Sequence, residues 1–298
     1  MNRLHSAFIS MVVCTAAAGC GAAPSSATAP DALPAIPGLV GVAANAFAPS
    51  LAKIGDRYYL AYESSLEKDS NFYLSTSTDA LHWSSAPVAP GQAPCLFPLG
   101  GKPAVAFDAG AGTIRIACEG TVSDATGLPE WSCNPAVIPL RQGGYAIAYD
   151  RLGGGCEVAK SSDGIHYEAP VTICDDGYEP ALAQEADGDL VIAYTAPNGI
   201  ARVTEENGTW SSPSLVVENP TATGPAISGE TLTYSKKEGA IRSLFQMVAG
   251  QETTLVSNGK NCAHPSVLLQ NGEHLVALGI RNSDGGQGVY LLANPTSR

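Results

Sequence analysis

The sequence predicts an all-β protein, a six-bladed β-propeller whose sheets are arranged around a central axis. First, Pro followed by Ser or Ala and then by apolar residues recurs along the 298-residue chain, at Pro49, Pro103, Pro135, Pro180, Pro225 and Pro265. Second, each copy continues as a short apolar run, a turn and a second apolar run. Third, with 15% charged residues, 32 Gly and 21 Pro, the composition is typical of a chain rich in turns. Repeats of this spacing indicate stacked supersecondary units.

The first repeat shows how each unit is expected to fold. The apolar run after Pro49 reaches a turn at Gly55 and continues as a strand over residues 58–62. Two strands joined by such a turn form a β-hairpin. The small residue after each Pro suits a strand beside the crowded axis, and Pro at the first position of a strand costs no ladder hydrogen bond. The unit at Pro103 is short, so a five-bladed propeller is the alternative.

A strand-like segment, residues 39–43, precedes the first repeat, whereas the last repeat ends near Leu292 with three strands in view. We expect the N-terminal segment to complete the last sheet and to close the ring. Closure is favourable because an open ring would expose unpaired strand edges. The propeller domain is therefore predicted to span residues 38–298.

The N-terminal residues are typical of a targeting segment. A basic start is followed by an apolar core and small residues before Cys20, which predicts a secretory signal over residues 1–19, too short to span a membrane. Ala-Gly before Cys20 resembles a bacterial lipobox and implies lipidation of Cys20; cleavage of an ordinary signal nearby is the alternative. Residues 20–37, rich in Ala, Pro, Ser and Thr, are expected to be a flexible tether. Gly21 implies sorting to the outer membrane, facing the periplasm or the cell surface.

The net charge limits the partners. A formal charge of -12 argues against nucleic acid or an anionic membrane as an electrostatic partner, so we expect membrane contact through the lipid anchor only. The sequence has no P-loop, no Gly-x-Ser-x-Gly and no His-Glu-x-x-His motif, and no cofactor is expected. A carbohydrate or another extracellular ligand is the expected partner.

Six cysteines remain once the signal and Cys20 are removed, and in an oxidising compartment they are expected to form disulfides. Cys156 and Cys174 could connect two strands of one sheet, and one of the others could reach Cys262. No Cys or His spacing typical of zinc is present, so no metal site is predicted. The six are Cys95, Cys118, Cys133, Cys156, Cys174 and Cys262.

Three segments share one turn pattern, residues 77–83, 161–167 and, more loosely, 204–210. Each begins with a hydroxyl, has a carboxylate two residues on, and ends with an aromatic residue. The hydroxyl and carboxylate can accept backbone N–H groups, and the aromatic can fill the space between neighbouring sheets. The pattern resembles the Asp box of sialidases and other BNR-repeat propellers. This resemblance implies a structural fastener away from the active face.

The residue before each repeat proline is expected to ring one end of the central channel, which we call the mouth. The residues that end the second strand of each repeat are expected to join it. Together they form a polar, mostly acidic cup, and concave mouths are usual ligand sites. The predicted set is Ala48, Lys102, Asn134, Glu179, Gly224 and His264 with Glu63, Glu119, Asp150, Thr195 and Ser235.

Glycosidase chemistry needs two carboxyl groups on either side of the scissile bond. Glu179, Glu119 and Asp150 are the candidate catalytic residues if the protein is an enzyme. Tyr178 could stack against a sugar ring, as could Trp131, and Arg151 and Arg281 are the arginines expected to reach the mouth. The candidate ligand-binding residues are Lys102, Asn134, Glu179, His264, Glu63, Tyr178, Arg151 and Arg281.

Two glycosidase families differ from this chain at the first repeat. Sialidases carry an Arg there in a Phe/Tyr-Arg-Ile-Pro motif, whereas this chain reads Ala46-Phe47-Ala48-Pro49. The repeat is also similar to the Asp-Pro-Ser start of arabinanase- and xylosidase-type propellers, whose Asp is the general base. The matching residue, Ala48, cannot accept a proton.

These observations favour a surface-anchored, non-catalytic propeller that binds a glycan or another extracellular ligand in its cup. A glycoside hydrolase that uses mouth carboxylates is one alternative, and a protein-interaction scaffold is another. The separation of the mouth carboxyl groups distinguishes the first two.

Overall fold

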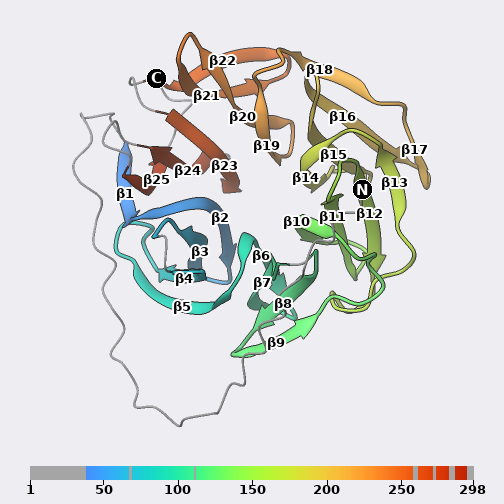
Figure 1. Cartoon of the computed structure of the whole chain (residues 1–298), viewed down its shortest axis with the longest axis horizontal. Coiled ribbons are helices and arrows are strands. Elements are labelled where there is room, and N and C mark those ends of the chain that lie inside the picture. The colour runs from blue at the N-terminus through green and yellow to red at the C-terminus, as the bar shows by residue number, and fades with distance from the viewer. Residues whose placement is uncertain are drawn as a thin grey trace, which may run out of the picture.

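A computed structural model describes residues 38–66, 69–110, 112–257, 261–270, 273–281 and 286–293. The expected signal (1–19), Cys20 and the tether (20–37) lie outside the described residues. The described part of the chain forms 25 β-strands in six sheets arranged around an axis (Figure 1). In this part, no helix is long and apolar enough to cross a membrane.

Each sheet is a blade, and its strands are called A to D from the axis outward. The first three blades follow the chain order. Blade 1 contains β2 (Ala46–Ile54), β3 (Arg57–Ser64), β4 (Asn71–Ser77) and β5 (Ser84–Pro90); blade 2 contains β6 (Gln92–Leu99), β7 (Lys102–Asp108), β8 (Ile114–Cys118) and β9 (Thr121–Asp124); blade 3 contains β10 (Ser132–Pro139), β11 (Tyr145–Arg151), β12 (Cys156–Ser161) and β13 (Val171–Cys174).

The remaining blades complete the ring. In blade 4 the outer strand is divided into two, and in blade 6 the outermost strand is the first strand of the chain. Blade 4 contains β14 (Tyr178–Gln184), β15 (Leu190–Ala196), β16 (Gly199–Glu206), β17 (Thr209–Trp210) and β18 (Ser214–Glu218); blade 5 contains β19 (Thr223–Ser228), β20 (Thr231–Glu238), β21 (Ile241–Val248) and β22 (Gln251–Val256); blade 6 contains β23 (Asn261–Gln270), β24 (Glu273–Arg281), β25 (Gln287–Ala293) and β1 (Leu39–Ala44).

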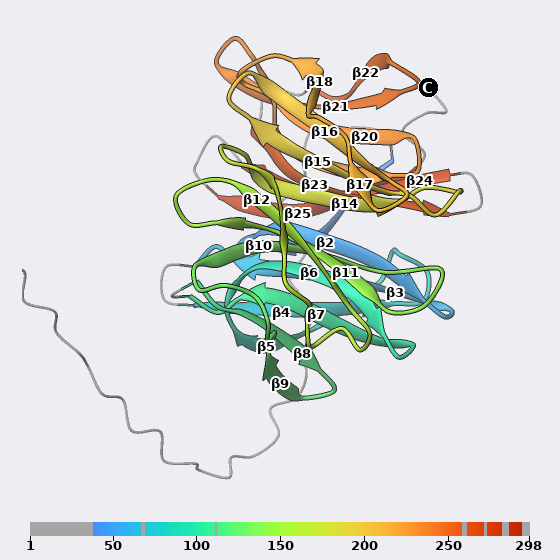
Figure 2. The same cartoon turned by 90° about the vertical axis from the view of Figure 1, so that its right-hand side faces the viewer.

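The predicted closure is confirmed. β1 pairs antiparallel with β25, with Leu39 opposite Leu292, so the first strand is the outermost strand of the last blade. The sheets stack side by side in the view turned by 90° (Figure 2). The ring has six blades, and the five-bladed alternative is not needed.

The predicted start of blade 2 is wrong. The inner strand is β6, which contains Pro94, and the segment at Pro103 is strand B, which follows the turn at Gly100 and Gly101. Both glycines have positive φ, which allows this tight reversal. The shift of one strand moves Lys102 to the face opposite the mouth. Glu119, in the turn between β8 and β9, lies on that same face, where its Oε2 is 2.6 Å from the Lys102 Nζ.

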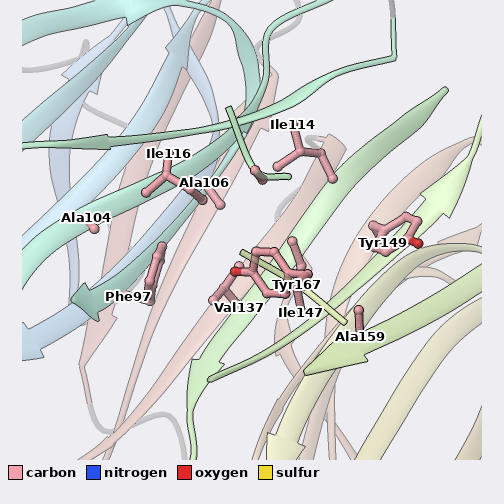
Figure 3. Packing of buried hydrophobic residues seen from close by; sticks show 11 residues of the cluster. Phe97, Ala104, Ala106, Ile114, Ile116, Val137, Ile147, Tyr149, Ala159 and Tyr167 are labelled. Carbon is pink, nitrogen blue, oxygen red and sulfur yellow. The ribbon is translucent and has the colours of Figure 1, made fainter. Parts of the chain in front are cut away.

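Apolar side chains fill the spaces between adjacent blades. Between blades 2 and 3, Ala106 and Ile116 from one sheet face Val137 and Ile147 from the next, and all four are at least 96% buried. Tyr167, from the turn after β12, inserts between the two sheets (Figure 3). The core is therefore a ring of inter-blade layers, each built from both neighbours.

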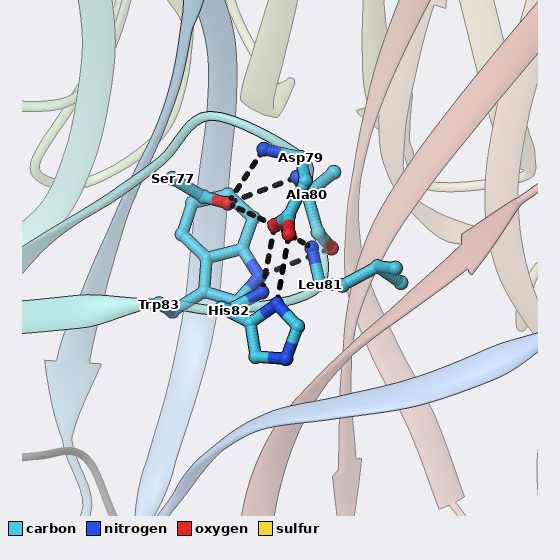
Figure 4. A network of polar contacts seen from close by, with 6 residues as sticks. All are labelled: Ser77, Asp79, Ala80, Leu81, His82 and Trp83. Atoms are coloured by element: carbon cyan, nitrogen blue, oxygen red, sulfur yellow. Dashed lines mark hydrogen bonds and ion pairs between the residues drawn. The ribbon is translucent and has the colours of Figure 1, made fainter.

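The first two Asp-box-like turns have the predicted hydrogen bonds. Ser77 Oγ accepts from the N–H groups of Asp79 and Ala80, at 3.2 and 2.9 Å, and Asp79 Oδ1 accepts from those of Leu81 and His82, both at 2.9 Å (Figure 4). The turn at residues 161–167 repeats every one of these bonds. The backbone hydrogen bond from His82, followed by the His82 side chain, holds the pKa of Asp79 well below its usual range.

In the part of the chain that the structure describes, no disulfide joins the cysteines. Cys156 in β12 and Cys174 in β13 are nevertheless directly opposite each other in blade 3. Cys95 instead contacts the next blade, since its Sγ accepts a hydrogen bond from the N–H of Val137 at 3.1 Å. The predicted disulfide pairing stays a prediction.

Candidate functional site: the mouth of the propeller

Every inner strand has the same backbone irregularity at the mouth. The residue before the proline has φ between +46° and +61° in all six blades, and the pairing of strands A and B shifts register there. Positive φ is uncommon for residues other than Gly, and such strained positions cluster at binding sites. The six left-handed residues are Ala48, Ala93, Asn134, Glu179, Gly224 and His264.

These residues and the prolines after them surround a central cavity of about 180 Å³. Five of the six residues predicted to ring the mouth line this cavity. In blade 2 the ring member is Ala93 and not Lys102, because the inner strand begins one strand earlier than expected. The sequence signal for this position was present in Ala93-Pro94, but Cys95 stands where the other repeats have Ala or Ser.

The end of strand B fastens each of three blades to the next one. Glu63 Oε1 in blade 1 accepts a hydrogen bond from the Ala93 N–H in blade 2 at 2.6 Å. Asp150 Oδ2 lies 3.4 Å from the Glu179 nitrogen, and Thr195 Oγ1 accepts from the Gly224 N–H at 3.1 Å. The left-handed conformation is thus coupled to an acceptor in the preceding blade, which gives these mouth residues a structural role.

Glu63 and Asp150 are largely removed from water, with 8% and 5% of their surfaces exposed. Burial raises the pKa of Glu63 to about 7, against the lowering effect of the Ala93 hydrogen bond. Burial likewise raises the pKa of Asp150 to about 6, although Asn134 Nδ2 donates to Asp150 Oδ2 at 3.0 Å. Asp150 Oδ1 is buried without a hydrogen-bond partner among the described residues. Glu63 lines the central cavity. Asp150 does not line it, but it accepts a hydrogen bond from Asn134, and Asn134 lines the cavity.

Glu179 lines the cavity from blade 4, which is three blades from Glu63 in either direction around the ring. Its Oε2 accepts from the Thr195 hydroxyl at 3.3 Å and from the Gly224 N–H at 3.1 Å. The mouth therefore has a buried, readily protonated carboxyl group on one side and a hydrogen-bonded carboxylate on the other.

Two depressions adjoin the central cavity. One, of about 370 Å³, lies beside His264 and includes Arg242, Arg281 and Asn261; the other, of about 480 Å³, lies beside Glu63 and includes Asn71. Phe47 lines both depressions and the central cavity. The three hollows together are large enough for a ligand of several rings.

Arg242 is a mouth residue that the sequence analysis missed. Its guanidinium NH1 lies 2.7 Å from Thr223 Oγ1 and 2.9 Å from the Thr221 carbonyl oxygen, so the side chain is held in place. It comes from the start of a third strand, and the repeat pattern contains no signal for that position. Arg281, predicted to reach the mouth, does line the depression beside His264.

Three other predicted residues lie outside these hollows. Arg151 is held by Glu157 and Asp175, at 3.4 and 3.9 Å, and does not line the central cavity. The side chains of Tyr178 and Trp131 are 43% and 51% exposed and do not line it either. Among the described residues, no cluster of three or more His, Cys, Asp or Glu residues could hold a metal ion.

Comparisons with known proteins agree with this fold. No family model and no curated protein matches the sequence. A solved protein of unknown function from Dyadobacter fermentans superposes with a TM-score of 0.65 at 15% identity, over 87% of this chain and 100% of that one. A mutant Trypanosoma rangeli sialidase with trans-sialidase activity gives 0.60 at 12% identity, over 83% of this chain and 54% of its own length, so this chain spans about half of the sialidase.

A thermostable family-43 glycoside hydrolase is also similar, with a TM-score of 0.54 at 14% identity, over 85% of this chain and 90% of that one. Identities this low show the fold and not the activity. The chain, a six-bladed propeller, is thus similar in fold to a sialidase and to a family-43 glycoside hydrolase.

Proposed function

We propose that the mouth binds a glycan without cleaving it. The observation that carries this proposal is the convergence of Glu63, Asn134, Glu179 and His264, from four blades, on one cavity. Among the described residues, the second carboxyl oxygen of Glu63 (Oε2) and that of Glu179 (Oε1) have no hydrogen-bond donor, which leaves each of them for a sugar hydroxyl.

The size and lining of the mouth also favour a sugar chain. The central cavity alone is smaller than the 300–1,000 Å³ that is usual for ligand pockets, but the cavity together with either adjoining depression falls within that range. Phe47, which lines all three, offers an aromatic surface for a sugar ring. The structural neighbours named as a sialidase and a family-43 glycoside hydrolase act on carbohydrates, which supports this ligand class.

Two features of the mouth argue against catalysis. Ala48 stands at the position where the similar arabinanase- and xylosidase-type propellers carry their general base, and it cannot accept a proton. Glu63 and Asp150 each use one carboxyl oxygen to hold the next blade. A residue fixed in this way can bind a hydroxyl, but it has little freedom to move during a reaction.

A glycoside hydrolase is the second candidate, favoured by the raised pKa of Glu63. A carboxyl group with a pKa of about 7 is partly protonated at neutral pH, as a general acid must be, and Glu179 across the mouth would be the second carboxylate. Glu119 is no longer a candidate, because it lies on the opposite face. Asp150 does not line the cavity and would act only through Asn134.

The place of action is part of the proposal. Lipidation of Cys20 and a tether over residues 20–37 would hold the propeller at the outer membrane, in reach of glycans at the periplasmic or cell surface. The signal over residues 1–19 would direct export, and the proposed partner is an extracellular carbohydrate. Binding by the mouth needs no cofactor.

The test combines a glycan array with product analysis by mass spectrometry, using the described propeller from Gly38 onward. We expect retention of a glycan without shortened products, and loss of retention in Glu179→Gln. Glu119→Gln is the matched control, since it makes the same change on the opposite face. Shortened products that disappear in Glu63→Gln would establish the hydrolase instead. Absence of both binding and cleavage across the array would contradict the proposal and favour a protein-interaction scaffold.

A further inference from the structure

Three of the inter-blade layers contain an aromatic side chain that follows strand C, from the C–D turn in blades 1 and 3 and from the short strand β17 in blade 4. Trp83 packs between blades 6 and 1, Tyr167 between blades 2 and 3, and Trp210 between blades 3 and 4. In each case the aromatic belongs to the later blade of the pair. The space that it fills is therefore a recurring feature of the ring.

The walls around these aromatics occupy equivalent strand positions. The earlier blade contributes two residues to the wall. The first is an alanine in strand B, which pairs with the residue that follows the proline of strand A. The second is the residue in strand C that pairs with this alanine. These positions hold Ala277 and Leu291 in blade 6, Ala106 and Ile116 in blade 2, and Ala148 and Val158 in blade 3.

The later blade contributes a second apolar pair to each wall. It consists of the second residue after the proline and its strand B partner, and all of these residues belong to the layers that contain the aromatics. The pairs are Leu51 and Leu60 in blade 1, Val137 and Ile147 in blade 3, and Leu182 and Ile192 in blade 4.

Between blades 4 and 5 the same walls surround a cavity of about 440 Å³. Ala193 and Arg202 stand at the two positions of the earlier blade, and Ile227 and Leu232 form the apolar pair of the later blade. The cavity opens on the face opposite the mouth, because Glu230, in the A–B turn of blade 5, lines it. It is thus separate from the proposed glycan site.

The cavity between blades 4 and 5 coincides with a short C–D turn in blade 5. Val248 pairs with Gln251, so only Ala249 and Gly250 connect β21 to β22, and both line the cavity. The corresponding turn of blade 1 is long enough to end in Trp83. Blade 5 therefore lacks the aromatic side chain that blades 1, 3 and 4 place in this space.

The strand C position of this wall is charged and not apolar. Arg202 stands where blades 6, 2 and 3 have Leu, Ile and Val, and its guanidinium is paired with the carboxylate of Glu185, which also lines the cavity. A guanidinium plane stacks well on an aromatic face, and an ion pair already made leaves no uncompensated charge. The wall is therefore suited to a flat neutral ring.

From this repetition we infer that the cavity between blades 4 and 5 is a binding site for a small molecule with one planar aromatic ring system, of the size of an indole. The ring takes the place that Trp83, Tyr167 and Trp210 fill at three other blade pairs. The volume lies within the usual range for small-molecule sites. The inference does not depend on what the mouth binds.

The test is titration calorimetry of the propeller with indole as the probe. We expect saturable binding at one site. A variant in which Ala249-Gly250 is replaced by the seven residues of the blade 1 turn, Ser77-Thr78-Asp79-Ala80-Leu81-His82-Trp83, supplies the missing Trp and should weaken indole binding at least tenfold. The matched control carries the same insertion with Ala in the place of Trp and should keep the affinity.

Point variants make the result independent of the loop exchange. Ala193→Leu narrows the cavity and should also weaken binding at least tenfold, whereas Glu179→Gln at the mouth should leave it unchanged. Circular dichroism and thermal unfolding verify that each variant is folded. No heat of binding in the wild type, or equal affinity in the Trp and Ala insertions, would overturn the inference.

Discussion

The carboxyl group of Glu63 in blade 1 accepts a hydrogen bond of 2.6 Å from the N–H of Ala93 in blade 2, although its pKa is raised to about 7. Burial opposes the ionised form more strongly than the hydrogen bond favours it. The contact between these blades is therefore sensitive to pH near neutrality.

This sensitivity predicts how stability changes with pH. The pKa of Glu63 is higher in the folded state (about 7) than in the unfolded chain (4.5), so the folded state binds more protons between these values. Stability should therefore fall as pH rises from 5 to 8, by about 3 kcal/mol at most from this group. Urea unfolding at several pH values measures it. Glu63→Gln should flatten the slope, and Glu119→Gln should not; equal slopes in all three proteins would contradict the assignment.

The aromatic residue of the turn after β12 should be a major source of stability. Tyr167 is 93% buried between blades 2 and 3, and truncation would leave a cavity there. We expect Tyr167→Ala to lower the free energy of unfolding by about 3–5 kcal/mol. Chemical denaturation checks the value. Trp131→Ala, at a side chain that is half exposed, should change it by less than about 0.5 kcal/mol.

Substitution by glycine should stabilise the fold at a left-handed mouth residue, whereas it should destabilise the fold at an ordinary strand residue. Ala93 has φ +48°, so Ala93→Gly relieves strain and should stabilise the fold by about 1 kcal/mol. Ala61, in the middle of β3 and fully buried, is the control, and Ala61→Gly should destabilise by about 1 kcal/mol or more. Melting temperatures of the two variants should move in opposite directions; a decrease in both would show that the strain is negligible.

Cys156 and Cys174 should form a disulfide under oxidising conditions. They are directly opposite each other in blade 3, and the hydrogen bond from the Cys156 thiol holds the pKa of Cys174 below its ordinary value, which favours the reactive thiolate. Oxidation removes two electrons and two protons, which diamide or a thiol oxidase would accept. Non-reducing peptide mapping identifies the linked pair. The bond should add about 3 kcal/mol, and Cys156→Ser should abolish this gain.

Much of the fold follows from local sequence patterns. The prolines of five inner strands and the hairpin turns that follow them were predicted correctly because each depends on residues close together in sequence. The closing strand was predicted because the last repeat has only three strands of its own. Blade 2 was misread because Pro103, at the second residue of strand B, has the same apolar surroundings as an inner-strand proline. A one-strand error of this kind exchanges the two faces of the blade, which is why Lys102 and Glu119 were misplaced.

The candidate site was predictable only in outline. The ring of residues before the prolines follows from the repeat, so Asn134, Glu179 and His264 were placed correctly at the mouth. Arg242 and Phe47 were not, because their approach to the cavity depends on how neighbouring blades pack. The cavity between blades 4 and 5 is recognised because blade 5 has no aromatic residue where blades 1, 3 and 4 have one. This difference becomes visible only when the blades are compared with one another.

The pairing of β1 with β25 separates the order of synthesis from the order of assembly. A ribosome makes β1 before the other described strands and β25 after them, so Leu39 must wait for Leu292 until the rest of the ring has been made. A chain stopped before residue 287 would leave β1 without its neighbour and blade 6 with a single hairpin. Premature termination near the C-terminus should therefore be as damaging to the first strand as to the last.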